Sequence, residues 1–126
     1  MANNFKSFEE LSCWKEARNL RLFIKDTIIT QLPNSEKYAL TDQIQRSSRS
    51  VGNNIAEGYG RFHFQENIQF CRIARGSLFE TLDHAIVAFD EKYISEKELN
   101  ELRKIHNKTL LILNGYIKYL KSQKEK

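Results

Sequence analysis

The sequence predicts an all-α fold, an antiparallel up-down-up-down four-helix bundle that occupies residues 1–126 as a single domain. Apolar residues recur every three or four positions over most of the chain, and no stretch alternates strictly between apolar and polar residues as a strand does. Residues that interrupt helices are few, since Pro33 is the only proline and Gly58 and Gly60 stand close together. Helices joined by such short loops pack against their neighbours in sequence.

The first two helices are predicted over residues 8–31 and 36–58. Ser7 and Glu10 have the spacing of a capping box in front of the first. The second follows Pro33, with Asn34 or Ser35 available as its N-cap. The stripe of the first helix comprises Phe8, Leu11, Ala17, Leu20, Ile24 and Ile28, and that of the second Leu40, Ile44, Ser48, Val51, Ile55 and Tyr59.

The third and fourth helices are predicted over residues 64–91 and 96–122, and Ser95 with Glu98 forms a second capping box. Their apolar coverage is wider than one stripe, which predicts a second buried surface. We interpret that surface as a subunit interface, and the alternative is a thicker core within one chain. The residues off the main stripe are Phe70, Ile73, Phe79, Ile86, Val87, Leu110, Ile112 and Ile117.

A polar stripe interrupts the second helix within the stretch SRSVGNNIAEGYGR, residues 48–61. Its members are spaced so that they share one helical face beside the apolar one, and the third helix offers polar partners. We interpret them as a buried, hydrogen-bonded network that fixes helix register. The predicted network consists of Ser50, Asn54, Glu57, Arg61, Ser77 and Glu80.

The alternative for this stripe is a catalytic carboxylate pair, Glu57 with Glu80. No hydrolase triad order, zinc-binding motif or phosphate-binding glycine loop accompanies the pair. The three histidines at 63, 84 and 106 lack the spacing of metal ligands. We therefore predict a protein that is not an enzyme, with no catalytic residues, no metal site and no cofactor.

A basic cluster on the first helix is the candidate nucleic-acid site: Lys15, Arg18, Arg21 and Lys25. Clustered cations supply most of the affinity for phosphates, and the chain carries a net charge of +4. The alternative is an ordinary solvated face, because Glu16 and Asp26 dilute the cluster. A second basic run, at 118, 121, 124 and 126, complements acidic residues at the start of the same helix.

The remaining composition predicts a cytoplasmic protein with no membrane association. No apolar run approaches the roughly 18 residues of a spanning helix, and the N-terminus MANNFKSFEE lacks the build of a signal peptide. Cys13 and Cys71 are too far apart in sequence for a redox or zinc motif, so we expect two reduced core thiols.

The segment SVGNNIAEG, followed by Arg61, resembles the signature S-[IV]-x-x-N-I-A-E-G of small bacterial proteins encoded in intervening sequences of large-subunit ribosomal RNA genes. The resemblance extends through FEELSCWKEARNL before it and FCRIARGSLFE after it, and thus to about Leu82. Cys71 departs from the aliphatic residue common in that family. The matching positions carry over as fold-defining residues: Ser50, Val51, Asn54, Ile55, Ala56, Glu57, Gly58, Gly76, Ser77 and Glu80.

That family resembles in fold the accessory protein of diversity-generating retroelements, and its members form ring-like homopentamers. The resemblance therefore implies a homopentamer, with structured RNA or DNA as a partner inferred from the genomic setting. Two hypotheses follow for function: a homo-oligomeric protein that binds nucleic acid through basic helix faces, and a homo-oligomeric scaffold for protein interaction with no nucleic-acid role.

Overall fold

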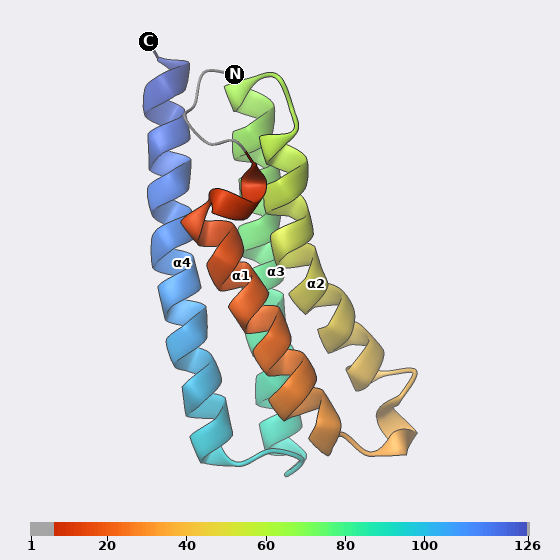
Figure 1. Cartoon of the computed structure of the whole chain (residues 1–126). Coiled ribbons are helices and arrows are strands. Elements are labelled where there is room, and N and C mark those ends of the chain that lie inside the picture. The colour runs from red at the N-terminus through yellow and green to blue at the C-terminus, as the bar shows by residue number, and fades with distance from the viewer. Residues whose placement is uncertain (1–6, 126) are drawn as a thin grey trace.

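The computed structural model describes residues 7–125, and these form four α-helices with no strand among them (Figure 1). The all-α prediction is therefore confirmed. The helices are α1 (Ser12–Phe23), α2 (Leu40–Tyr59), α3 (Phe64–Asp90) and α4 (Glu96–Lys124). None of the helices within the described residues is long and apolar enough to cross a membrane.

The helices pack in a closed circuit: α1 contacts α2, α2 contacts α3, α3 contacts α4, and α4 returns to α1. Figure 1 places the connections from α1 to α2 and from α3 to α4 at one end, and the connection from α2 to α3 at the other. One apolar core fills the centre, as expected of a four-helix bundle. Its largest fully buried side chains are Leu11, Leu20, Ile24, Ile28, Ile44, Ile55, Ile68, Leu78, Leu99, Leu102, Leu113 and Leu120.

The predicted first helix is divided rather than continuous. The Ser7 hydroxyl accepts a hydrogen bond from the Glu9 amide at 3.1 Å, but it caps a separate 3-10 turn, Phe8–Glu10, and α1 begins only at Ser12. At the other end, a π-helical turn over Ile24–Ile28 and a 3-10 turn over Ile29–Gln31 replace the α-helix. Four consecutive β-branched residues at 27–30 disfavour the α-helix there, and the Thr30 hydroxyl bonds to backbone carbonyls instead.

The second helix begins at Leu40, four residues later than predicted. Neither Asn34 nor Ser35 caps it, because both lie in a separate 3-10 turn, Asn34–Glu36, that Pro33 precedes. The Glu36 carboxylate takes the capping role: its Oε1 accepts from the Leu40 amide at 3.3 Å, and its Oε2 accepts from the Tyr93 hydroxyl at 2.9 Å. One carboxylate thus ties the start of α2 to the connection between α3 and α4.

The bounds of the third and fourth helices follow the prediction within one or two residues. The Ser95–Glu98 capping box is confirmed, since the Ser95 hydroxyl accepts from the Glu98 amide at 3.1 Å and the Glu98 carboxylate accepts from the Ser95 amide at 2.8 Å. Apolar side chains also remain on the outside of these helices. Ile73 is 52% exposed, Phe79 49% and Leu111 73%.

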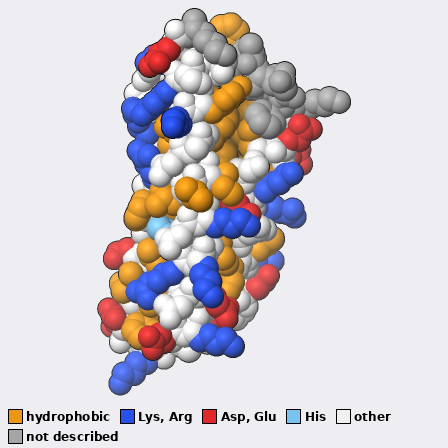
Figure 2. Space-filling model, turned by 90° about the vertical axis from the view of Figure 1, so that its left-hand side faces the viewer, with side chains coloured by type: hydrophobic (Ala, Val, Ile, Leu, Met, Phe, Trp, Pro, Cys, Tyr) orange, Lys and Arg blue, Asp and Glu red, His pale blue; other side chains and the backbone are white. Residues whose placement is uncertain are grey.

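Figure 2 shows the side of the molecule on which α4 lies, with hydrophobic side chains spread along it between charged ones. Of the residues predicted to lie off the main stripe, Ile117 is buried in the core, while Phe70, Ile86, Leu110 and Ile112 are partly buried. The thicker core thus accounts for these five. Ile73, Phe79 and Val87 stay exposed within the single chain.

Two glycines of α2 give a matched stability test. A Cβ at Gly58 would lie 2.7 Å from Asn67 Oδ1 and 2.9 Å from Phe70 Cβ, whereas one at Gly52 would meet Trp14 Nε1 at an ordinary 3.5 Å. We expect Gly58→Ala to destabilise the fold by about 1 to 3 kcal/mol through overpacking. Gly52→Ala should raise stability by up to about 1 kcal/mol, because Ala favours the helix.

Thermal melts at a fixed protein concentration compare the two variants with the parent. Equal melting temperatures for Gly58→Ala and Gly52→Ala would mean that α2 and α3 do not approach closely at Gly58.

Candidate nucleic-acid interface

The structure divides the predicted basic cluster of α1. Arg18 and Arg21 border one pocket between α1 and α2, whereas Lys15 borders a neighbouring hollow on the same helix. Lys25 is exposed and lines neither of them, because it lies in the π-helical turn where the helical phase changes. The four cations therefore do not act as one continuous row.

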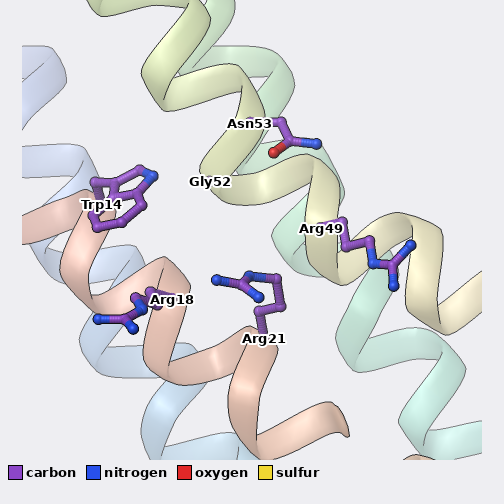
Figure 3. A pocket seen from close by; sticks show the side chains of 6 residues that line it. All are labelled: Trp14, Arg18, Arg21, Arg49, Gly52 and Asn53. Carbon is purple, nitrogen blue, oxygen red and sulfur yellow. The ribbon is translucent and has the colours of Figure 1, made fainter. Parts of the chain in front are cut away.

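The pocket bordered by Arg18 and Arg21 has a volume of about 230 Å³ (Figure 3). Trp14 lines it from α1, and Arg49, Gly52 and Asn53 line it from α2. The basic cluster predicted from the sequence included neither Arg49 nor Trp14. Their convergence depends on the register between α1 and α2, which no local pattern in either helix reveals.

Within residues 7–125, the three arginines of this pocket have no acidic partner. No described residue forms an ion pair or hydrogen bond with the side chains of Arg18, Arg21 or Arg49. Two other arginines are compensated: Arg46 of α2 lies 3.6 Å from Asp42, and Arg61, just after α2, lies 3.3 Å from Glu57. The pocket is therefore a local excess of positive charge, which attracts anions.

The side chain of Trp14 packs against α2 at one end of the pocket. The indole packs beside Gly52 of α2, where a Cβ would lie at an ordinary contact distance of 3.5 Å from Trp14 Nε1. Phe8 holds the other side of the indole edge to face, with ring centroids 5.1 Å apart. The indole is thus fixed in place at one end of the arginine pocket.

The hollow around Lys15 differs in charge from the arginine pocket. Its lining includes two carboxylates, Glu9 and Glu16, and Lys108 of α4 lies 3.3 Å from Glu16. Trp14 and Arg18 line both hollows and so stand between them. Lys15 therefore lies in mixed surroundings, as expected of an ordinary solvated face.

The C-terminal basic run also lies on the surface. Lys118, Lys121 and Lys124 are exposed on α4, Lys124 hydrogen-bonds to the side chain of Gln65, and Lys126 lies outside the described residues. These lysines share no pocket with the arginines of α1 and α2.

Part of the predicted polar network is present between α2 and α3. The hydroxyls of Ser50 and Ser77 are 2.8 Å apart and share a hydrogen bond. The Asn54 amide donates to both the carbonyl and the hydroxyl oxygen of Ser50, each at 2.8 Å. Thr81 extends the network, with its Oγ1 2.9 Å from Ser47 Oγ, and both of these residues are buried. Sequence reasoning missed Ser47 and Thr81.

The expectation that Glu57, Arg61 and Glu80 are buried in this network is wrong. Glu57, at the end of α2, forms an exposed ion pair with Arg61 in the connection that follows, and Arg61 also lies 3.6 Å from Glu66. The physical reason is that Gly58 packs against α3 instead, and the residue before it is rotated by about 100° around the helix.

Glu80 is also exposed, 3.9 Å from His84, and it borders a hollow with Gln43 and Arg46. That hollow begins 11 residues from Glu57 along α2, a helical rise of about 16 Å. The catalytic carboxylate pair of Glu57 and Glu80 is therefore not assembled.

The remaining nucleophilic groups lie in the core. Burial raises the pKa of the Cys13 thiol and that of the Cys71 thiol to about 12 each, so neither forms a thiolate readily near neutral pH. Within residues 7–125, no group of three or more His, Cys, Asp or Glu side chains is placed to hold a metal ion. The residues that line the arginine pocket include no His, Cys, Asp or Glu.

The fold and this surface define a small all-α protein, a four-helix bundle with an uncompensated basic pocket between its first two helices. The chain belongs to the 23S rRNA-intervening sequence protein family, because the model of that family matches residues 9–115. The resemblance noted in the sequence is thereby confirmed. No protein with a curated description matches the chain in sequence.

The chain is also similar to a crystal structure at 1.70 Å resolution of a protein with unknown function from the S23 ribosomal protein family from Bacteroides thetaiotaomicron VPI-5482. The TM-score is 0.75, the sequences are 21% identical, and the match covers 84% of this chain and 98% of the other. At this identity the likeness shows the fold alone.

The polar contacts between α2 and α3 give a second matched test. Asn54→Ala removes two hydrogen bonds around Ser50, and we expect a loss of about 1 to 2 kcal/mol in the free energy of unfolding. Glu57→Ala removes only an exposed ion pair and should cost less than about 1 kcal/mol. Chemical denaturation of both variants measures the difference, and a larger loss for Glu57→Ala would contradict the assignment.

Proposed function

We propose that the protein is a non-enzymatic homo-oligomer that binds RNA or DNA through the basic face formed by α1 and α2. The observation that carries this proposal is the convergence of Arg18, Arg21 and Arg49 on one pocket without an acidic partner. Guanidinium groups without carboxylate partners are available to neutralise phosphates, and the cations that a nucleic acid then releases contribute to affinity. The family's association with ribosomal RNA genes supports nucleic acid as that polyanion.

The proposed assembly is a ring-like homopentamer of antiparallel up-down-up-down bundles. Successive connections at opposite ends of the bundle support the antiparallel arrangement of the subunit. The apolar side chains left exposed on α3 and α4 support burial against a second copy, since Ile73 and Leu111 are each more than half exposed. The pentameric number itself rests on the resemblance to the family.

Two glycines on this outer surface also support a subunit interface. Gly76 of α3 and Gly115 of α4 lie inside helices, where glycine costs about 1 kcal/mol relative to alanine. A Cβ at either would meet nothing within 4 Å in the described part of the chain. Close approach by another copy would give these glycines a structural role.

We place the protein in the cytoplasm, because both cysteines are buried free thiols and reduced cysteines are typical of that compartment.

Substitution of the arginines tests the nucleic-acid proposal. We expect the triple variant Arg18→Gln, Arg21→Gln and Arg49→Gln to keep its fold and assembly but to bind a structured RNA more weakly. The slope of log affinity against log salt should become shallower by up to about three, because up to three phosphate contacts are lost per site. Fluorescence anisotropy of a labelled RNA hairpin across a salt series measures both quantities.

Arg103→Gln on α4 is the matched control, since it removes one exposed guanidinium whose hydrogen bond goes to the neighbouring Asn100 of the same helix. Its affinity should stay within about twofold of the parent, the change expected of one exposed charge away from the site. Unchanged affinity and slope in the triple variant would exclude the α1–α2 face as the binding site.

A second experiment tests the interface. In a free chain, Gly76→Ala with Gly115→Ala should raise the melting temperature, because alanine favours the helix and meets no neighbour. In the proposed oligomer the added methyl groups lie at the subunit contact, and we expect the double variant to dissociate. Light scattering after size exclusion should give five times 14.8 kDa for the parent and a smaller mass for the variant.

Gly52→Ala is the control for that experiment, because Gly52 lies on the α1–α2 face. A higher melting temperature with unchanged mass in the Gly76→Ala, Gly115→Ala variant would place the interface elsewhere.

The second candidate function is a homo-oligomeric scaffold for protein interaction with no nucleic-acid role. It is favoured by the same exposed apolar side chains of α3 and α4, which lie apart from the arginine pocket. An intact oligomer that shows no affinity for RNA or DNA at low salt would support the scaffold and overturn the first proposal.

A further inference from the structure

The charge of the arginine pocket exceeds what one internal phosphate of a strand requires. Arg18, Arg21 and Arg49 together bring three positive charges, and no carboxylate lines the pocket. A guanidinium donates up to five hydrogen bonds and accepts none, so the lining presents an excess of donors. An internal phosphodiester carries a single negative charge, whereas a phosphate monoester carries between about one and a half and two at neutral pH. The charge balance favours the monoester.

The end of the pocket at Trp14 is bordered by acidic residues. Beyond Trp14 and Arg18 lies the neighbouring hollow, which Glu9 and Glu16 line. A polyanionic strand that continued in this direction would pass close to both carboxylates, and like charges repel. A strand that ends inside the pocket avoids them.

Trp14 supplies what a terminal nucleotide would need besides charge. Its indole is partly exposed at the end of the pocket, and its Nε1 donates no hydrogen bond to any described residue. The edge-to-face contact with Phe8 holds the ring in place. A fixed indole offers a flat apolar surface for a sugar or base and one further donor.

The size of the pocket agrees with this kind of ligand. A volume of about 230 Å³ lies below the range of about 300 to 1,000 Å³ typical of pockets for drug-sized molecules. It accommodates a phosphate with part of its nucleoside. A base-paired duplex does not enter a space of this size, so the recognised nucleotide is unpaired.

From these observations we infer that the pocket of Trp14, Arg18, Arg21 and Arg49 binds the unpaired terminal nucleotide of an RNA or DNA strand through its terminal phosphate monoester. This inference rests on the proposed function, because it takes the ligand of that same face to be a nucleic acid. It adds the chemical feature that is recognised, the end of a strand.

The experiment compares oligouridylates of about eight nucleotides that differ only at their ends. One carries a 5′-phosphate, one a 3′-phosphate and one hydroxyls at both ends, and uridine monophosphate serves as the free nucleotide. Trp14 is the only tryptophan of the chain, so quenching of its fluorescence reports binding at the pocket itself. We expect at least one end-phosphorylated strand to bind about tenfold or more tightly than the dihydroxyl strand, as charge-assisted hydrogen bonds allow.

Two variants test whether the preference for a terminal phosphate arises in the arginine pocket. Arg49→Gln should lower the ratio between phosphorylated and dihydroxyl strands by about threefold or more, because it removes one of the three guanidinium groups, the one that α2 contributes. Arg103→Gln on α4 should leave the ratio unchanged. Circular dichroism and light scattering on both variants verify that fold and assembly are retained.

The outcomes separate this inference from the proposed function. Equal affinity for all strands, weakened by Arg49→Gln, would overturn the terminal phosphate and leave nucleic-acid binding in place. Tight binding of uridine monophosphate without any gain from the attached strand would assign the pocket to free nucleotides and overturn the strand end. No binding of any strand, even at low salt, would overturn the proposed function together with the inference.

Discussion

The packing of Gly58 against Asn67 is the constraint on which the rest of the bundle depends. Asn67 is fully buried, its amide donates to the Tyr116 hydroxyl at 3.1 Å, and its Oδ1 accepts from the Cys71 thiol at 3.6 Å. One side chain thus links three helices directly beside the connection from α2 to α3. Farther along the same pair, the Ser50–Ser77 bond lies at a matching level, so polar contacts hold one register over successive turns.

The number of helices, their type and most of their ends could be predicted, because apolar spacing and capping signals are local properties of a sequence. The beginning of α2 and both ends of α1 could not. At Leu40 the cap is Glu36, whose second oxygen is held by Tyr93 from a distant loop. After Phe23 the apolar stripe continues, and by itself it predicts a longer α-helix. The β-branched residues that follow disfavour the α-helix, and a π-helical turn forms instead.

The candidate site was predicted in part for a similar reason. Arg18 and Arg21 share one face of one helix, which spacing reveals, but Arg49 joins them only through the packing of α1 on α2. Glu57 illustrates the opposite error. It shares a helical face with Asn54 by spacing, yet the close approach at Gly58 decides which side of the last turn meets α3. Because Gly58 and not Glu57 faces α3, the carboxylate of Glu57 is exposed instead of buried.

Cys13 belongs to α1 and Cys71 to α3, two helices that are not neighbours in the circuit. Both thiols are buried in the shared core, close enough to influence each other. A reagent such as iodoacetamide reaches the buried thiol of Cys71, which lies inside α3, only when the bundle opens. The rate at which Cys71 is alkylated in native buffer therefore measures opening of the domain, whereas alkylation of Cys13, the second residue of α1, also reports fraying of that helix end. Because both native thiols are buried and react slowly, a cysteine introduced on the surface can be labelled selectively without first replacing Cys13 and Cys71.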